Sequence, residues 1–126
     1  MNNKTFGEQT TVLHVRRFRR ARENFARLFT EKFNIEGNVE SAEQAIAVIK
    51  SKRPAVIIAG SMFEDGTIAD ILQAVRTEPN YRPHIILTTV FLEYTVSKFQ
   101  NIDIVFREQG SCCLDRVVEY LDGLLE

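Results

Sequence analysis

Short apolar runs alternate with longer amphipathic segments along almost the whole chain. The clearest runs are Ala55–Ala59 (AVIIA) and His84–Thr88 (HIILT), and both are largely apolar at consecutive positions instead of alternating with polar residues. A strand with this pattern is buried on both faces, which is typical of a parallel sheet covered by helices. The alternation therefore predicts a doubly wound α/β fold, with helices on both sides of a parallel sheet.

The remaining elements follow from the same periodicities. Strands are also predicted over residues 11–15, 34–39 and 102–106, and helices over residues 19–32, 68–75, 92–99 and 112–125. A further helix is predicted between Ser41 and Pro54, where Ser41 and Gln44 have the spacing of a capping box. Residues 1–10 are polar and are expected to form a flexible leader, followed by one domain over residues 11–126.

Composition narrows the functional classes. The 126 residues are 44% hydrophobic and carry a net charge of −1, which suits one globular domain and argues against nucleic-acid binding driven by overall charge. No apolar run is long enough to span a bilayer, and residues 1–10 lack the apolar stretch of a secretion signal. The adjacent Cys112 and Cys113 do not have the spacing of a zinc site. We therefore expect a cytoplasmic domain without a metal or cofactor.

With the elements in this order, the segments SAEQAIAVIKSKRPAVIIA and RPHIILTT resemble the receiver domains of response regulators. The resemblance extends from about Thr11 to Leu125. It implies a flavodoxin-like sheet of five parallel strands in the order 2-1-3-4-5, with the site at the carboxyl ends of the strands. It also implies an aspartate phosphoacceptor after the third strand, an acidic pair for Mg²⁺, a lysine and a hydroxyl.

Most of these positions are altered. The phosphoacceptor position falls on Gly60, the acidic pair on Arg16 and Arg17, and the lysine on Arg107, whereas the hydroxyl is kept as Thr88. Glycine cannot form an acyl phosphate, and guanidinium groups do not ligate Mg²⁺, which takes oxygen ligands. The resemblance therefore implies a pseudo-receiver that is not phosphorylated, and we expect no enzymatic activity.

The altered corner suits an anion better than a cation, because guanidinium groups match phosphate and carboxylate geometry. One hypothesis is that a phosphorylated small ligand or an acidic side chain binds to Arg16, Arg17, Ser61, Thr88 and Arg107. The alternative is that nearby carboxylates fold in and neutralise the arginines; these are Glu64, Asp65 and Glu108. As a substitute phosphoacceptor, Asp65 is expected to lack partners.

Two segments are candidates for protein contacts. Six of the eleven arginines lie between residues 16 and 27, which indicates either a solvated, partly self-paired helix face or a docking edge for an acidic partner or nucleic acid. The predicted helix over residues 92–99 is apolar on more than one face. By the resemblance, a homodimer or partner face would include Phe91, Tyr94, Phe99, Ile104 and Arg116. His14 and His84 lie in predicted strands and are expected in the core or in a pocket wall.

These arguments favour a phosphorylation-independent interaction module in bacterial signalling, which docks to a protein partner such as a signalling kinase or regulatory protein. Direct reading of nucleic acid is not expected, because the arginine-rich segment lacks both a helix-turn-helix pattern and stacking aromatic residues. Two alternatives stay open: a sensor of anionic ligands, and the receiver part of a longer transcription regulator.

Overall fold

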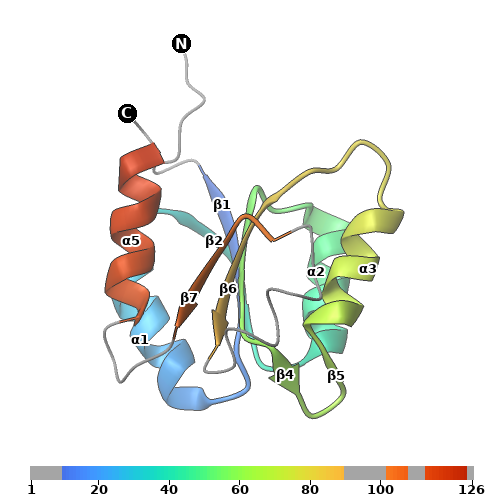
Figure 1. The fold of residues 1–126 in the computed structure, drawn as a ribbon, viewed down its shortest axis with the longest axis horizontal. Helices are drawn as coiled ribbons and strands as arrows, with labels where there is room; N and C mark the ends of the chain where they lie inside the picture. Colours follow the sequence, from blue (N-terminus) through green and yellow to red (C-terminus); the bar gives the residue numbers. More distant parts are fainter. Residues whose placement is uncertain (1–9, 90–101, 108–112, 125–126) are drawn as a thin grey trace.

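A computed structural model describes residues 10–89, 102–107 and 113–124 (Figure 1). Its main sheet has five parallel strands in the order β2-β1-β3-β6-β7. Their bounds are β1 Thr11–Val15, β2 Asn34–Val39, β3 Val56–Ala59, β6 His84–Thr89 and β7 Ile104–Arg107. Counted within this sheet, the order is 2-1-3-4-5, so the predicted fold class is confirmed.

Helices cover both faces of the sheet (Figure 1). One face carries α1 (Arg19–Phe29) and α5 (Cys113–Leu124), and the other carries α2 (Ala42–Lys52) and α3 (Ile68–Thr77). Among the described residues, no helix combines the length and the apolarity that a membrane crossing requires. Most of the predicted leader, the predicted helix over residues 92–99 and Cys112 lie outside the described residues.

Two apolar clusters, one on each face of the sheet, join the three layers. Ile57 of β3 packs in the cluster formed with α2 and α3, and its neighbour Ile58 packs in the cluster formed with α1 and α5. Both side chains are fully buried. Successive residues of a strand point to opposite faces, so a continuous apolar run is needed where both faces are covered.

Helix α1 ends at Phe29, earlier than the predicted end at residue 32. After it the chain turns, and the buried ring of Phe33 lies 5.3 Å from the ring of Phe29. The N–H of Phe33 still donates to the Phe29 carbonyl at 3.0 Å, but the N–H of Asn34 donates to the carbonyl of Thr10 at 2.9 Å. The helix therefore ends because the chain leaves it to pair with β1 as strand β2.

Helix α2 begins as predicted, with one difference at its cap. The Oγ atom of Ser41 accepts a hydrogen bond from the backbone N–H of Gln44 at 3.1 Å. The side chain of Gln44 accepts from the backbone N–H of Glu40 at 3.2 Å, one residue before the predicted partner. The predicted capping box is thus only half formed, because the Gln44 side chain reaches past the cap residue.

The loop predicted after Gly60 contains a small antiparallel hairpin, β4 (Met62–Phe63) and β5 (Gly66–Thr67). Thr67 then caps α3: its hydroxyl accepts from Ala69 N–H at 3.2 Å, and Asp70 accepts from Thr67 N–H at 2.9 Å. Strands of two residues carry no measurable periodicity, so the sequence pattern did not reveal them.

Candidate functional site

The carboxyl ends of the central strands meet at the lower edge of the sheet in Figure 1. Arg16 follows β1 and Gly60 follows β3, while Thr88 lies near the end of β6. The backbone N–H of Gly60 donates to the carbonyl of Val15 at 3.0 Å, which holds the ends of β1 and β3 side by side. The fold therefore brings three of the predicted site positions to one edge.

At this edge the side chain of Arg16 lies over Gly60. A Cβ atom added to Gly60 would lie 2.8 Å from Cδ and 2.9 Å from Nε of Arg16. Nη1 of Arg16 donates a hydrogen bond to the Thr88 hydroxyl at 3.0 Å, and that hydroxyl is 3.4 Å from the carbonyl oxygen of Ala59. Arg16 therefore occupies the space that a side chain at position 60 would need.

The other predicted members of the corner have different neighbours. Cζ of Arg17 lies 5.1 Å from the ring centroid of Phe18, and the hydroxyl of Ser61 hydrogen-bonds with that of Thr89 at 3.1 Å. The backbone of Arg107 pairs with Thr89 in the sheet, but the structure does not describe the Arg107 side chain. The structure thus brings together the first arginine, the glycine and Thr88, and anion binding at this corner stays a prediction.

Asp65 has backbone partners at the start of α2. Its carboxylate oxygens accept hydrogen bonds from the N–H groups of Ala42 at 2.8 Å and Glu43 at 2.9 Å. The hydrogen bond from Glu43, followed by that from Ala42, lowers the pKa of Asp65. The sequence did not predict these hydrogen bonds, which form because the β4–β5 turn brings Asp65 to the N–H groups at the start of a helix that lies more than twenty residues away in sequence.

Arg22 supports the connection between β1 and α1, a role that sequence reasoning missed. Its Nη1 donates to the carbonyl oxygens of Arg16 at 2.9 Å and Arg17 at 3.0 Å, and its Nη2 lies 3.5 Å from Glu40. The side chain is only 17% exposed, so it does not belong to a solvated helix face. No sequence signal distinguishes it from the neighbouring arginines, because its acceptors are backbone carbonyls positioned by the loop.

His14 lies beneath this connection, fully buried in β1. Its ring stacks on Phe25 with centroids 4.1 Å apart, and Nδ1 lies 2.8 Å from Oδ1 of Asn38. Because the Asn38 amide donates to the carbonyl of Arg22 at 2.8 Å, its oxygen faces His14 and Nδ1 carries the imidazole proton. Burial lowers the pKa of His14 to about 3, so the ring is neutral, as suits a core residue.

The predicted dimer or partner face lies mainly outside the described residues, since Phe91, Tyr94 and Phe99 belong to the 90–101 segment. Of its remaining members, Ile104 packs against the apolar cluster beneath α1 and α5, and Arg116 is exposed on α5. Binding of a partner or of a second copy at this face therefore stays a prediction.

Known structures share the fold of this chain at low sequence identity. No family model matches the chain, and no curated protein matches it. The N-terminal domain of an uncharacterized protein from Wolinella succinogenes matches with a TM-score of 0.74 and 15% identity, covering 90% of this chain and 94% of that chain. A response regulator from Thermotoga maritima, in complex with Mg²⁺ and BeF, matches with a TM-score of 0.72 and 20% identity, covering 90% and 99%.

A DNA-binding response regulator of the LuxR family from Staphylococcus aureus also matches, with a TM-score of 0.71 and 18% identity over 90% of this chain and 98% of that chain. The chain therefore has the fold of response-regulator receiver domains.

The Mg²⁺ ion seen with the Thermotoga maritima protein does not fit this edge of the sheet. Mg²⁺ binds oxygen ligands, carboxylates above all, whereas the group lying over Gly60 is the guanidinium-bearing side chain of Arg16. Within the described ranges, no three His, Cys, Asp or Glu side chains are grouped so that they can hold a metal ion.

The contact between Arg16 and Gly60 leads to a first prediction. Replacing Gly60 by alanine should lower the free energy of unfolding by about 1 kcal/mol, because the new Cβ displaces Arg16 and breaks its hydrogen bond to Thr88. In an Arg16→Ala background the same substitution should be neutral or slightly stabilising. Urea unfolding of the four proteins measures this coupling.

Gly123→Ala is the matched control, because nothing lies within 4 Å of a Cβ atom at that position. Its effect should be the same with and without Arg16. An equal cost of Gly60→Ala in both backgrounds would show that Arg16 does not occupy the space over Gly60.

Proposed function

We propose that the chain is a phosphorylation-independent docking module of bacterial signal transduction, which acts in the cytoplasm by binding a partner protein and performs no covalent chemistry. The observation that carries the proposal is the placement of Arg16 over Gly60, with its hydrogen bond to Thr88. Position 60 offers no carboxylate that a phosphoryl group could be transferred to, and the side chain of Arg16 fills the space over Gly60.

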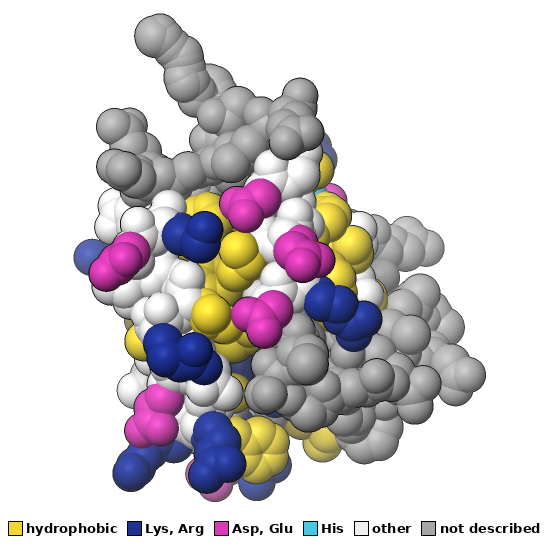
Figure 2. Space-filling model, turned by 90° about the vertical axis from the view of Figure 1, so that its left-hand side faces the viewer, with side chains coloured by type: hydrophobic (Ala, Val, Ile, Leu, Met, Phe, Trp, Pro, Cys, Tyr) yellow, Lys and Arg dark blue, Asp and Glu magenta, His cyan; other side chains and the backbone are white. Residues whose placement is uncertain are grey.

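An exposed surface at the start of α1 supports docking. We define the basic loop surface as Arg17, Phe18, Arg19 and Arg20. Phe18 is 58% exposed, which is unusual for so large an apolar side chain, and Arg17 lies against its ring. Figure 2 shows Lys and Arg side chains gathered at the lower end of the face that carries α1 and α5.

The described residues neutralise little of the charge of this surface. The first turn of α1 contains no acidic residue. Arg19 pairs with Glu23 at 3.2 Å, but both side chains are largely exposed, and such a pair contributes little. This confirms one of the pairs expected for a self-paired helix face, and it leaves the positive field of the surface largely intact.

The partner that fits the basic loop surface is a protein with an acidic surface and an apolar recess. Opposite charge would steer the encounter, and a large aromatic side chain surrounded by arginines is the kind of residue that dominates the binding energy of an interface. We therefore assign Phe18 as the anchor and the neighbouring arginines as the steering charges of the docking surface.

Phosphorylation independence is tested by thermal unfolding with Mg²⁺ and beryllofluoride, and by mass spectrometry after incubation with Mg²⁺ and acetyl phosphate. We expect no change in Tm and no phosphoryl adduct. A ligand present at one hundred times its Kd would stabilise the fold by about 2.7 kcal/mol, so binding at the edge would be evident. Stabilisation by beryllofluoride with Mg²⁺ would contradict the proposal.

Docking is tested by incorporating the photo-cross-linker p-benzoylphenylalanine at position 18 in living cells, with position 50 on the exposed side of α2 as the control site. We expect one dominant cross-linked protein with an acidic surface from position 18, lost in an Arg17→Glu/Arg20→Glu variant. The same products from both sites would contradict docking at this surface. A cross-linked dimer would contradict the acidic partner and support self-association.

A second candidate function is the sensing of an anionic ligand at the corner of Arg16, Arg17 and Arg107. The hydroxyl of Thr88 favours it, because it lies 3.0 Å from Nη1 of Arg16 and adds a polar group beside the guanidinium. An anion would have to replace Thr88 as the acceptor for the Arg16 guanidinium. Stabilisation by inorganic phosphate that disappears in Arg16→Gln would support this function.

A further inference from the structure

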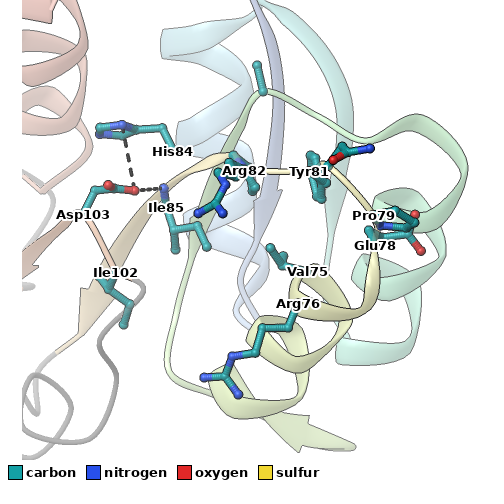
Figure 3. A pocket seen from close by; sticks show the side chains of 13 residues that line it. Val75, Arg76, Glu78, Pro79, Tyr81, Arg82, His84, Ile85, Ile102 and Asp103 are labelled. Carbon is teal, nitrogen blue, oxygen red and sulfur yellow. Dashed lines mark hydrogen bonds and ion pairs between the residues drawn. The ribbon is translucent and has the colours of Figure 1, made fainter.

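A hollow of about 840 Å³ lies at the opposite end of the sheet from Arg16 and Gly60. It is bounded by the end of α3, the connection from α3 to β6, and the residues just before β7 (Figure 3). Its size is within the range of pockets that hold small molecules. Ligands of open α/β sheets usually bind at the carboxyl ends of the strands, so neither the fold nor the proposed docking accounts for this hollow.

Two arginine side chains extend into this hollow. Figure 3 shows the guanidinium group of Arg76, from α3, between α3 and Ile102, and that of Arg82, from the connection to β6, beside Ile85. Within the described ranges, Arg82 makes no hydrogen bond or ion pair. Arg76 has one weak contact, 3.5 Å from the side chain of Gln73. Both guanidinium groups are therefore able to take an acceptor from a ligand.

The carboxylates that line the hollow already have partners. Glu78 forms an ion pair with Arg53 at 2.9 Å. Asp103 accepts a hydrogen bond from the backbone N–H of Ile85 at 2.6 Å, and its carboxylate lies 3.9 Å from Nδ1 of His84. These contacts hold the negative charges at the two ends of the hollow, away from the space between the guanidinium groups (Figure 3).

The remaining wall is apolar. Val75, Ile85 and Ile102 line the hollow beside the arginines, and Val75 and Ile85 are buried. The hydroxyl of Tyr81 is engaged with the carbonyl of Pro54 at 2.6 Å, so this residue offers its ring and not its polar group. A ligand that fits has an anionic group and an apolar body.

We propose that this hollow binds a small organic anion, whose carboxylate or phosphate is held by Arg76 and Arg82 and whose apolar part packs against Val75, Ile85 and Ile102. Each guanidinium group supplies forked donors that match such an anion, and both side chains are long and exposed, so both can turn toward one group. The carboxylate of Asp103 places the anion toward α3, because a position close to β7 would bring like charges together. The proposal does not depend on the docking function or on Arg16.

The test is a titration of the complete chain with phenyl phosphate, followed by two-dimensional amide NMR. We expect saturable shifts of the Val75 and Ile85 amide signals. An Arg76→Gln/Arg82→Gln variant should bind at least about tenfold more weakly, which corresponds to about 1.4 kcal/mol. Inorganic phosphate should bind more weakly than phenyl phosphate, and phenol should not produce these shifts, because each lacks one half of the recognised chemistry.

Arg27→Gln/Lys50→Gln is the matched control, since it removes the same charge from exposed positions of α1 and α2 and should leave binding unchanged. Asp103→Asn should strengthen binding, because it removes the repelling charge and keeps an oxygen for the Ile85 N–H. All the replaced side chains are exposed, so the variants should fold, and the amide spectrum checks that they do. Absence of saturable shifts, equal binding by the Arg76→Gln/Arg82→Gln variant, or shifts centred on Gly60 would overturn the proposal.

Discussion

Lowering the pH from 6.5 to 4.5 is expected to reduce the free energy of unfolding by about 2 kcal/mol through His14 alone. Burial lowers the pKa of this residue from 6.5 to about 3 in the folded chain. The unfolded chain therefore takes up a proton in this range and the folded chain does not, so stability falls by about 1.4 kcal/mol per pH unit once the pH is well below 6.5. The contribution is fully present above pH 6.5 and lost as the pH falls toward 3.

The physical cause is the position of the ring between a strand and a helix. One face of the imidazole stacks on Phe25 and Nδ1 hydrogen-bonds with Asn38, while Nε2 is buried and has no hydrogen-bond partner in the described part of the chain. A proton added at Nε2 would place a charge in an apolar site with no acceptor. Arg16 and Arg22 oppose that charge further.

Urea unfolding at pH 6.5, 5.5 and 4.5 measures the effect, with His14→Phe as the control that keeps a ring against Phe25 and removes the titrating group. As the pH falls, the wild-type protein should lose stability relative to the variant. His14→Gln provides a second non-titrating variant if His14→Phe does not fold. Parallel pH dependences of the wild-type protein and either variant would refute the assignment.

Replacing Phe25 by alanine should lower the free energy of unfolding by about 3–5 kcal/mol. The side chain is fully buried beneath α1, where its ring lies 4.1 Å from His14 and 4.4 Å from Phe29. Its removal leaves a cavity between α1 and the sheet that these aromatic neighbours cannot close by small shifts. An effect of this size approaches the whole stability of a small domain.

Phe18→Ala is the matched control, because the same side chain is removed from an exposed position only seven residues earlier in the sequence. It should change the stability by less than about 0.5 kcal/mol. Equal costs at the two positions would mean that Phe18 is part of the core, which would also remove it as the docking anchor. Urea unfolding of both variants under the same conditions makes the comparison.

Much of the fold could be predicted because it depends on local periodicity. The continuous apolar run of β3 requires cover on both faces, and the apolar stripes of the helices provide it. The β4–β5 hairpin could not be predicted in this way, since a strand of two residues has no period. The early end of α1 depends on the pairing of Asn34 with β1, which is a property of the assembled sheet.

The candidate site could be predicted in part. The positions of Arg16, Gly60 and Thr88 follow from the strand order, because the carboxyl ends of adjacent parallel strands lie together. The roles of Asp65 and Arg22 did not follow from the strand order. Asp65 accepts hydrogen bonds from backbone N–H groups of another segment, and Arg22 donates to backbone carbonyl groups of another segment. The hollow at the other end of the sheet also had no sequence signature, since its two arginines come from separate elements.

The sequence by itself determined that position 60 has no nucleophile, because glycine has no side chain in any fold. It also determined the layered α/β architecture, because the apolar periodicities admit few other arrangements. Only the tertiary structure decided what each arginine contacts. An arginine side chain is long and flexible, so its partner depends on which acceptors the fold brings within reach: for Arg16 a hydroxyl 72 residues away, for Arg22 two carbonyl groups, and for Arg17 an exposed ring.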